Sequence, residues 1–168
     1  LKEAVFKGLA GDKGLFMPEN IPILPSSFFY ESGKKKFKDV AFEVASALFG
    51  EDIPKNDLKE LTLEAINFET PLVQVHDHIY SLELFHGPTL AFKDIGARFM
   101  ARLLKYFTLD HDKEIHVLVA TSGDTGSAVA NGFLGVEGIK VYILYPKGLV
   151  SFLQEKQFTT LGQNITAL

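Results

Sequence analysis

Lys93 is a candidate nucleophile by its residue type and by its place in the chain. It follows a Gly-Pro turn and three apolar residues, and a stretch of helical apolar spacing begins just after it. Desolvation by these neighbours and the positive end of that helix would both disfavour the ammonium form of Lys93. A neutral lysine amine can form a Schiff base with a carbonyl group. Asp94 opposes this effect and could equally cap the helix, with Lys93 in solvent, so position alone leaves both interpretations open.

A second candidate site is the segment from Ala120 to Ser127, which lies between a predicted buried strand and a predicted helix. Ligands of open α/β sheets bind at the carboxyl ends of strands, where such a segment lies. Its glycines let the backbone approach a ligand, its hydroxyl groups can donate, and the helix N-terminus favours negative charge. These features predict a small-anion site, and the alternative is a tight turn with a Ser or Asp cap. No lysine follows the second glycine, so the segment is not a nucleotide P-loop.

Asp124 is the unusual member of this segment, because a carboxylate repels a bound anion unless it faces a cation or a donor. Lys93 could supply such a group. Two histidines, His76 and His78, could share one face of a strand, but no third ligand has matching spacing, so we predict no metal site. Arg98 and Arg102 are one helical turn apart, and a solvated helix face is the favoured interpretation for them.

The predicted elements place both segments in an α/β fold. Residues 1 to about 68 are mostly helical, with amphipathic helices at 37–49 and 56–67. After Pro71 the pattern predicts strands at 72–75 and 79–84, a helix at 95–107, a strand at 115–120, a helix at 125–134, a strand at 141–145, a helix at 149–161 and a strand from 164. Two near-continuous apolar strands joined by a helix indicate a parallel βαβ unit. Because a parallel sheet needs more strands and two covered faces, we expect a fragment of a larger fold.

The composition argues against several classes of partner. A formal net charge of -4 argues against nucleic acid and anionic membranes, and the one basic cluster, at 34–38, is expected to be a solvated loop leading into a helix. Cysteine is absent, which excludes disulfides, thiolate metal sites and a cysteine nucleophile. No apolar run approaches the roughly 20 residues that span a bilayer. We therefore expect a cytoplasmic protein.

Two long motifs resemble those of a known family. Residues 82–94, LELFHGPTLAFKD, resemble the pyridoxal-phosphate attachment segment of threonine synthases, and residues 120–126, ATSGDTG, resemble their substrate loop. Agreement continues at 8–18, at YPKG in 145–148 and at LQEKQ in 153–157. The resemblance therefore runs over nearly the whole chain in the right order.

The resemblance implies a fold-type-II, tryptophan-synthase-β-like enzyme, with a helical N-terminal domain at 1–70 and the truncated beginning of the pyridoxal-phosphate-dependent domain at 71–168. Such enzymes convert O-phospho-L-homoserine and water to L-threonine and phosphate. Lys93 would bind pyridoxal phosphate covalently and act as general acid and base. Asp124 would face the cofactor, at a position where related enzymes usually carry Asn. The substrate α-carboxylate would be held by Thr121, Ser122, Gly123 and Thr125.

Several alternatives stay open at this point. A related phospho-lyase that forms a keto acid, or a non-catalytic relative, would share these motifs, and His86 could line the cofactor pocket or serve only a turn. In this family, the loop that holds the cofactor phosphate lies beyond Leu168, as does the residue facing the pyridine nitrogen. We therefore expect the 168-residue chain alone to bind the cofactor poorly and to be inactive. The oligomeric state is not predicted.

Overall fold

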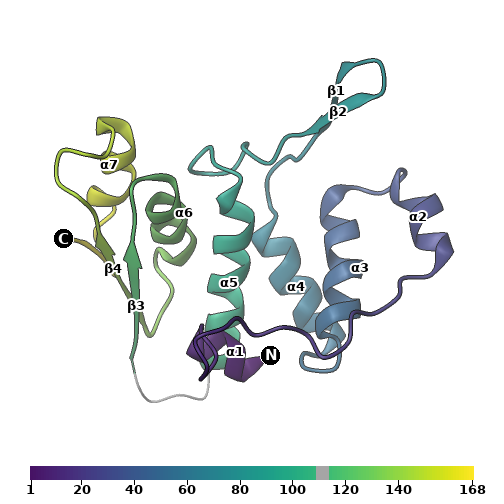
Figure 1. The fold of residues 1–168 in the computed structure, drawn as a ribbon, viewed down its shortest axis with the longest axis horizontal. Coiled ribbons are helices and arrows are strands. Elements are labelled where there is room, and N and C mark those ends of the chain that lie inside the picture. The colour runs from purple at the N-terminus through teal and green to yellow at the C-terminus, as the bar shows by residue number, and fades with distance from the viewer. Residues whose placement is uncertain (109–113) are drawn as a thin grey trace. The chain divides into compact units, whose positions relative to one another are not determined.

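The computed structural model describes residues 1–108 and 114–168, which form two compact units, Leu1–Asn67 and Phe68–Leu168 (Figure 1). The first unit is helical, and the second combines helices with a parallel sheet and a hairpin. This combination confirms the predicted α/β class. Within the described residues, no helix has the length and apolar character needed to cross a membrane.

The first unit is held together by a helical pair. Its helices are α1 (Lys2–Lys7), α2 (Ser26–Ser32), α3 (Phe37–Phe49) and α4 (Lys55–Ala65). Helices α3 and α4 pack together, and Ala45, Leu58 and Ala65 are buried. The helix predicted at 37–49 coincides with α3, because its apolar period is complete. Helix α2 was not predicted, and it buries no residue that could have produced such a period.

The basic cluster at 34–38 contains one lysine that is not simply solvated. Lys34, Lys36 and Lys38 are exposed, whereas Lys35 is half-buried. Lys35 Nζ lies 2.7 Å from an oxygen of Glu43 and 3.4 Å from one of Glu31. The hydrogen bond with Glu43 raises the pKa of Lys35 above its ordinary value. The cluster leads into α3 as predicted, but Lys35 belongs to an ion-pair network.

The second unit contains a sheet of three parallel strands in the order β3 (Ile115–Ala120), β4 (Ile139–Leu144) and β5 (Ile165–Ala167). The strands predicted at 115–120, 141–145 and from 164 are confirmed, with small shifts at their ends. Along β4, buried residues alternate with more exposed ones, so one face of the sheet is covered and the other is open. All three strands point the same way, so the segments after β3 and β4 emerge at one edge.

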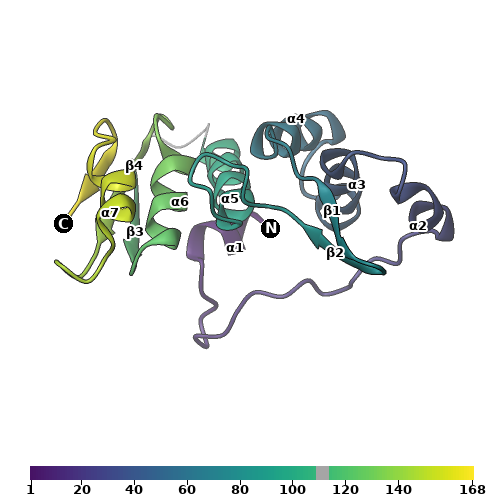
Figure 2. The same ribbon diagram turned by 90° about the horizontal axis from the view of Figure 1, so that it is seen from above.

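Three helices accompany this sheet: α5 (Lys93–Thr108), α6 (Asp124–Phe133) and α7 (Phe152–Thr159). Helix α6 contacts β3, β4 and α7, and in both ribbon views it lies between α5 and the strands (Figures 1 and 2). Helices α5 and α6 approach closely at Gly132, where a Cβ atom would lie 3.1 Å from the backbone of Ala97. Glycine therefore fixes how near α6 can come to α5.

Two arginines of α5 differ from the prediction of a solvated helix face. Arg98 is only 7% exposed. Arg102 is half-buried, and its Nη1 donates to the carbonyl oxygen of Gly132 at 3.0 Å. The prediction was wrong because the small residue at 132 brings α6 against the side of α5 that carries these arginines.

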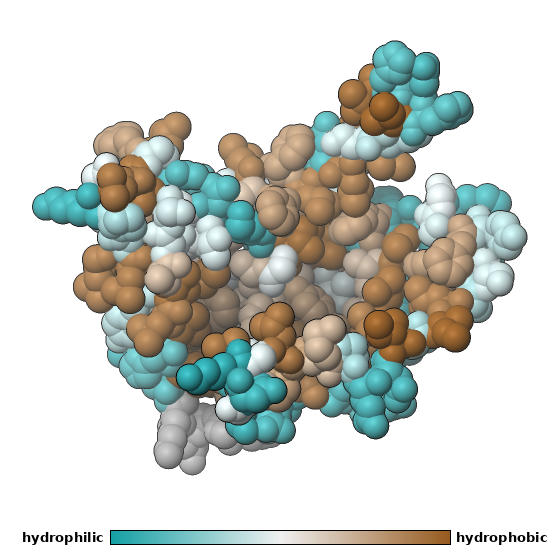
Figure 3. Space-filling view, in the orientation of Figure 1, coloured by the Kyte–Doolittle hydropathy of each residue, from teal (hydrophilic) through white to brown (hydrophobic). Residues whose placement is uncertain are grey.

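A hairpin precedes α5. Strands β1 (Leu72–His76) and β2 (Ile79–Leu82) pair antiparallel, and Asp77 in the turn has a φ of 36°. This confirms the predicted strands with a turn at Asp77 and His78. Its apolar side chains are exposed, for example Val75 at 66%, and Figure 3 shows hydrophobic surface on this hairpin at the upper right.

Candidate active site

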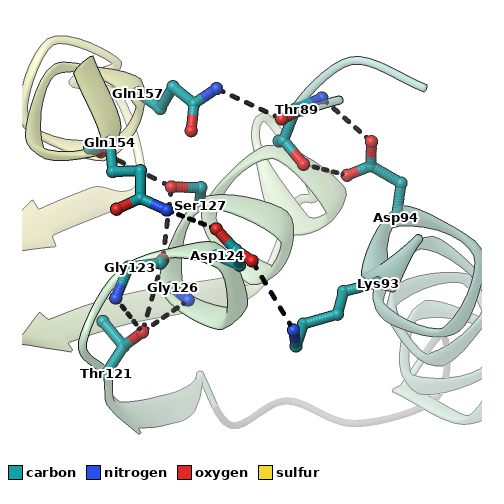
Figure 4. Close-up of polar contacts among 10 residues, drawn as sticks. All are labelled: Thr89, Lys93, Asp94, Thr121, Gly123, Asp124, Gly126, Ser127, Gln154 and Gln157. Atoms are coloured by element: carbon teal, nitrogen blue, oxygen red, sulfur yellow. Dashed lines mark hydrogen bonds and ion pairs between the residues drawn. The ribbon is translucent and has the colours of Figure 1, made fainter. Parts of the chain in front are cut away.

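The loop that follows β3 is organised by the hydroxyl group of Thr121. Thr121 Oγ1 accepts hydrogen bonds from the N–H groups of Gly123 at 3.0 Å and Gly126 at 2.9 Å (Figure 4). A Cβ atom at Gly126 would lie 2.3 Å from Thr121 Cγ2, so glycine is required there. The hydroxyl of Thr121 therefore closes the loop just before α6 begins. Contact of Thr121 or Gly123 with a substrate stays a prediction.

The N-terminus of α6 presents other polar groups to solvent. Ser122, Asp124 and Thr125 are exposed, while Gly123, Gly126 and Ser127 are buried. Asp124 is the first residue of α6, where the partial positive charge of the helix favours a carboxylate or another anion. The hydroxyl groups of Ser122 and Thr125 are accessible to a small anion at this position. Binding of an anion there stays a prediction from the sequence.

Lys93 lies opposite this loop. It is the first residue of α5, two residues earlier than the predicted start at Ile95. Lys93 Nζ lies 3.8 Å from Asp124 Oδ2 (Figure 4). It also lies 4.6 Å from the centre of the Phe92 ring. The Lys93 side chain is 34% exposed, so it is partly shielded from solvent and partly accessible. The two residues singled out for their chemistry are thus brought together by the first turns of neighbouring helices.

Asp94, which follows Lys93, is turned toward a different partner. Its carboxylate is fully buried and accepts hydrogen bonds from the Thr89 N–H at 2.9 Å and the Thr89 hydroxyl at 2.6 Å. A Cβ atom at Gly87 would lie 2.5 Å from Asp94 Oδ2, so glycine at that position makes room for the carboxylate. The bonds of Asp94 thus tie the loop before α5 to its first turn, and Lys93 faces Asp124 rather than Asp94 (Figure 4).

Helix α7 contributes two glutamines for which no role was predicted. Gln154 Nε2 donates to Asp124 Oδ1, and Gln157 Nε2 donates to the Thr89 carbonyl oxygen at 3.2 Å. The hydroxyl of Ser127 lies 3.4 Å from the backbone oxygen of Gln154 and donates to it. The predicted topology could have indicated these glutamines, because α7 begins at the same edge of the parallel sheet as α6. Their partners, however, lie 27 to 68 residues away in the chain.

The described histidines near this region pair with carboxylates. His86 Nε2 lies 2.7 Å from Glu83 Oε2, and its ring packs on Phe85. His76 Nδ1 lies 3.1 Å from Asp77 Oδ2 in the exposed hairpin. Across residues 1–108 and 114–168, no three His, Cys, Asp or Glu side chains are grouped so as to hold a metal ion.

Comparisons with known proteins agree with this architecture. Residues 1–66 match the family model described as threonine synthase N terminus. Threonine synthase of Escherichia coli is 46% identical over 163 residues, and that of Buchnera aphidicola subsp. Baizongia pistaciae is 45% identical over 167 residues. By sequence, the chain matches the N-terminal portion of threonine synthases. These matches cover 97% and 99% of the chain, and 38% and 39% of the two relatives.

Solved threonine synthase structures match the same portion of the fold. The E. coli enzyme superimposes with a TM-score of 0.89 at 45% identity, and the match covers 99% of this chain and 39% of that one. A threonine synthase from Brucella melitensis, solved with pyridoxal phosphate bound, gives a TM-score of 0.90 at 36% identity over 99% of this chain and 37% of that one. The chain thus spans about two fifths of the length of these threonine synthases.

Proposed function

We propose that this chain supplies the lysine and substrate-binding part of a pyridoxal-phosphate-dependent threonine synthase. In this reaction O-phospho-L-homoserine and water give L-threonine and phosphate, as a step of threonine biosynthesis. The observation that carries the proposal is the approach of Lys93 Nζ to Asp124 Oδ2, 3.8 Å apart, at the start of α6. We also propose residues 1–70 as the N-terminal helical domain, residues 71–168 as the beginning of the catalytic domain, and a cytoplasmic location.

The residues present fit the cofactor. A partly shielded primary amine beside an aromatic ring suits a covalent link to an aldehyde, and Phe92 provides that ring. Bound there, pyridoxal phosphate supplies an electron sink for carbon–hydrogen and carbon–oxygen bond cleavage. The Brucella relative binds the same cofactor, which supports the assignment.

Each residue then has a distinct task. Lys93 would hold the cofactor and afterwards take and return protons as a general base and acid, from the rim of a site bounded by α5 and α6. Asp124 Oδ2 faces Lys93, so this carboxylate would stabilise positive charge there. Ser122, Gly123 and Thr125 would hold the substrate carboxylate at the positive end of α6. Thr121, also predicted to contact that carboxylate, would act at least by keeping the loop closed.

This proposal is tested by assaying the whole protein, as the cell produces it, with O-phospho-L-homoserine as substrate. Wild type should take up stoichiometric pyridoxal phosphate, show its visible absorbance, and release equal amounts of phosphate and L-threonine. Lys93→Ala should lose the absorbance and at least about 1,000-fold in turnover, because covalent attachment and proton transfer are both lost. Lys105→Ala, at the other end of α5, is the matched control and should retain both.

Retention of the visible absorbance by Lys93→Ala would show that Lys93 is not the attachment residue. Release of phosphate with a keto acid in place of threonine would identify a phospho-lyase instead. Absence of both cofactor uptake and phosphate release in wild type would identify a non-catalytic relative.

A further inference from the structure

The Gln154 side chain bridges α7 and the loop that carries Asp124. Its Nε2 donates to Asp124 Oδ1 (Figure 4). Its Oε1 accepts from the hydroxyl of Ser151 at 3.0 Å. An ionised carboxylate can only accept hydrogen bonds, so the amide nitrogen has to face Asp124 and the amide oxygen has to face Ser151. Ser151 is also the N-cap of α7, because its hydroxyl accepts from the Gln154 N–H. The amide is therefore held on both sides.

The loop is shaped to receive this amide. Gly123 has a φ of 150°, and a Cβ atom there would lie 2.6 Å from Gln154 Oε1. The backbone conformation favours glycine at 123, and the missing side chain leaves room for the Gln154 amide in this position. Ser127, one turn into α6, donates to the backbone oxygen of Gln154. Side chain and backbone of Gln154 are therefore both docked against the start of α6.

The consequence for Asp124 is a division of its two oxygens. The Asp124 side chain is 51% exposed, and an exposed carboxylate without a partner samples several rotamers. The bond from Gln154 occupies Oδ1, and Oδ2 is left directed at Lys93 Nζ. A carboxylate held in this way presents a fixed oxygen to whatever group Lys93 carries.

We propose that Gln154 is a positioning residue that orients Asp124 toward Lys93 and its cofactor. This rests on the proposed function, in which Asp124 faces the cofactor. Gln154 touches neither the cofactor nor the substrate in this scheme, and it acts through Asp124 alone. The alternative is a purely structural role, in which Gln154 only holds α7 against the loop.

Gln157 offers a matched control on the same helix. Its Nε2 also donates a hydrogen bond from α7 to another segment of the chain, but the acceptor is the neutral carbonyl oxygen of Thr89, in the loop before α5. Gln154→Leu and Gln157→Leu each remove one side-chain amide at nearly constant volume. If both glutamines were only fasteners, the two variants would lose stability and activity together. A second variant, Gln154→Glu, keeps the polarity of the site but sets a carboxylate against Asp124.

The first measurement uses the protein freed of cofactor, so it does not depend on the reaction. The side-chain NH2 resonances of Gln154 should shift when Asp124→Asn replaces the carboxylate that they contact with a neutral amide. The Gln157 NH2 resonances, whose acceptor is the Thr89 carbonyl oxygen, should be the same in both proteins. Gln154 resonances that do not respond to Asp124→Asn would overturn the proposal.

The second measurement uses the loaded protein. Gln154→Leu should shift the visible absorbance of the Lys93-bound cofactor and lower kcat about 10-fold or more, with KM changed less than about 3-fold. Gln154→Glu should lower kcat at least as far, since like charges then meet. Gln157→Leu should keep the wild-type spectrum, with a change in Tm of similar size to that of Gln154→Leu. Equal spectra and equal kcat in the two leucine variants would overturn the proposal.

Failure of the proposed function gives a different result. Wild-type protein that takes up no cofactor would refute the threonine synthase assignment. The comparison of Gln154 resonances in cofactor-free wild type and Asp124→Asn would still report whether Gln154 holds Asp124.

Discussion

Thr121→Val isolates the role of one hydroxyl group in closing the loop after β3. Valine keeps the branched shape of threonine and its contact with Gly126, but a methyl group replaces the oxygen that accepts two backbone N–H groups. Both donors belong to buried glycines, so the lost bonds are not fully replaced by water. At about 1 kcal/mol for each neutral hydrogen bond, the loop should lose about 2 kcal/mol of local stability.

Native-state hydrogen exchange measures this loss where it occurs. A loss of about 2 kcal/mol corresponds to roughly 30-fold faster exchange of the Gly126 amide, if the loop opens locally. Thr121→Ser retains the oxygen and serves as the control, with exchange within about 3-fold of wild type. Amides of helix α3, which belongs to the other compact unit, should be unchanged in both variants.

Two outcomes would refute this reasoning. Equal exchange of Gly126 in Thr121→Val and Thr121→Ser would mean that the hydroxyl does not hold the loop. Equally fast exchange in α3 would mean that the substitution destabilised the whole protein rather than the loop.

Two further substitutions test buried polar contacts by urea denaturation. Thr89→Val leaves the fully buried Asp94 carboxylate without its hydroxyl donor and should cost about 2–3 kcal/mol in the free energy of unfolding, whereas Thr89→Ser should cost less than about 1 kcal/mol. Equal losses in the two Thr89 variants would show that the hydroxyl is unimportant. Asn164→Leu removes bonds to the carbonyl oxygens of Phe133 and Ile139 and from the Gly135 N–H, and should cost about 2–3 kcal/mol. The exposed Asn56→Leu is its control, expected within about 0.5 kcal/mol of wild type. A similarly small loss for Asn164→Leu would show that its three hydrogen bonds do not stabilise the fold.

The elements with a complete apolar period could be predicted closely from the sequence. Helix α3 and strand β3 have the predicted bounds, because the apolar residues of α3 repeat at the helical period and the less exposed residues of β3 alternate with more exposed ones. Helix α2 buries no residue, so nothing in its sequence carries that period. The start of α5 at Lys93 also could not be predicted from the apolar period, because the first turn of this helix is held by the hydrogen bonds between Asp94 and Thr89.

Only part of the candidate site could be predicted from the sequence. Lys93 and Asp124 were singled out by residue type, by motif and by their places before helices, and the structure brings them together. Gln154 stands in a motif that matches the family pattern, yet its bond to Asp124 spans 30 residues and depends on where α7 docks. The arginines of α5 were misinterpreted for a similar reason, because Gly132, whose carbonyl oxygen accepts from Arg102, lies 30 residues beyond Arg102 in the chain. Spacing predicts contacts within one element but not contacts between elements.

The close approach of α5 and α6 at Gly132 makes the site sensitive to small rotations. Gly132 lies eight residues after Asp124, or about 12 Å along the axis of α6. A tilt of α6 by about 5° around this contact would therefore displace Asp124 by about 1 Å. Such a displacement is large beside the 3.8 Å between Lys93 Nζ and Asp124 Oδ2. The hydrogen bond from Arg102 to the Gly132 carbonyl oxygen holds α6 at the point about which it would tilt. It therefore helps to keep Asp124, at the other end of that segment of α6, in place relative to Lys93.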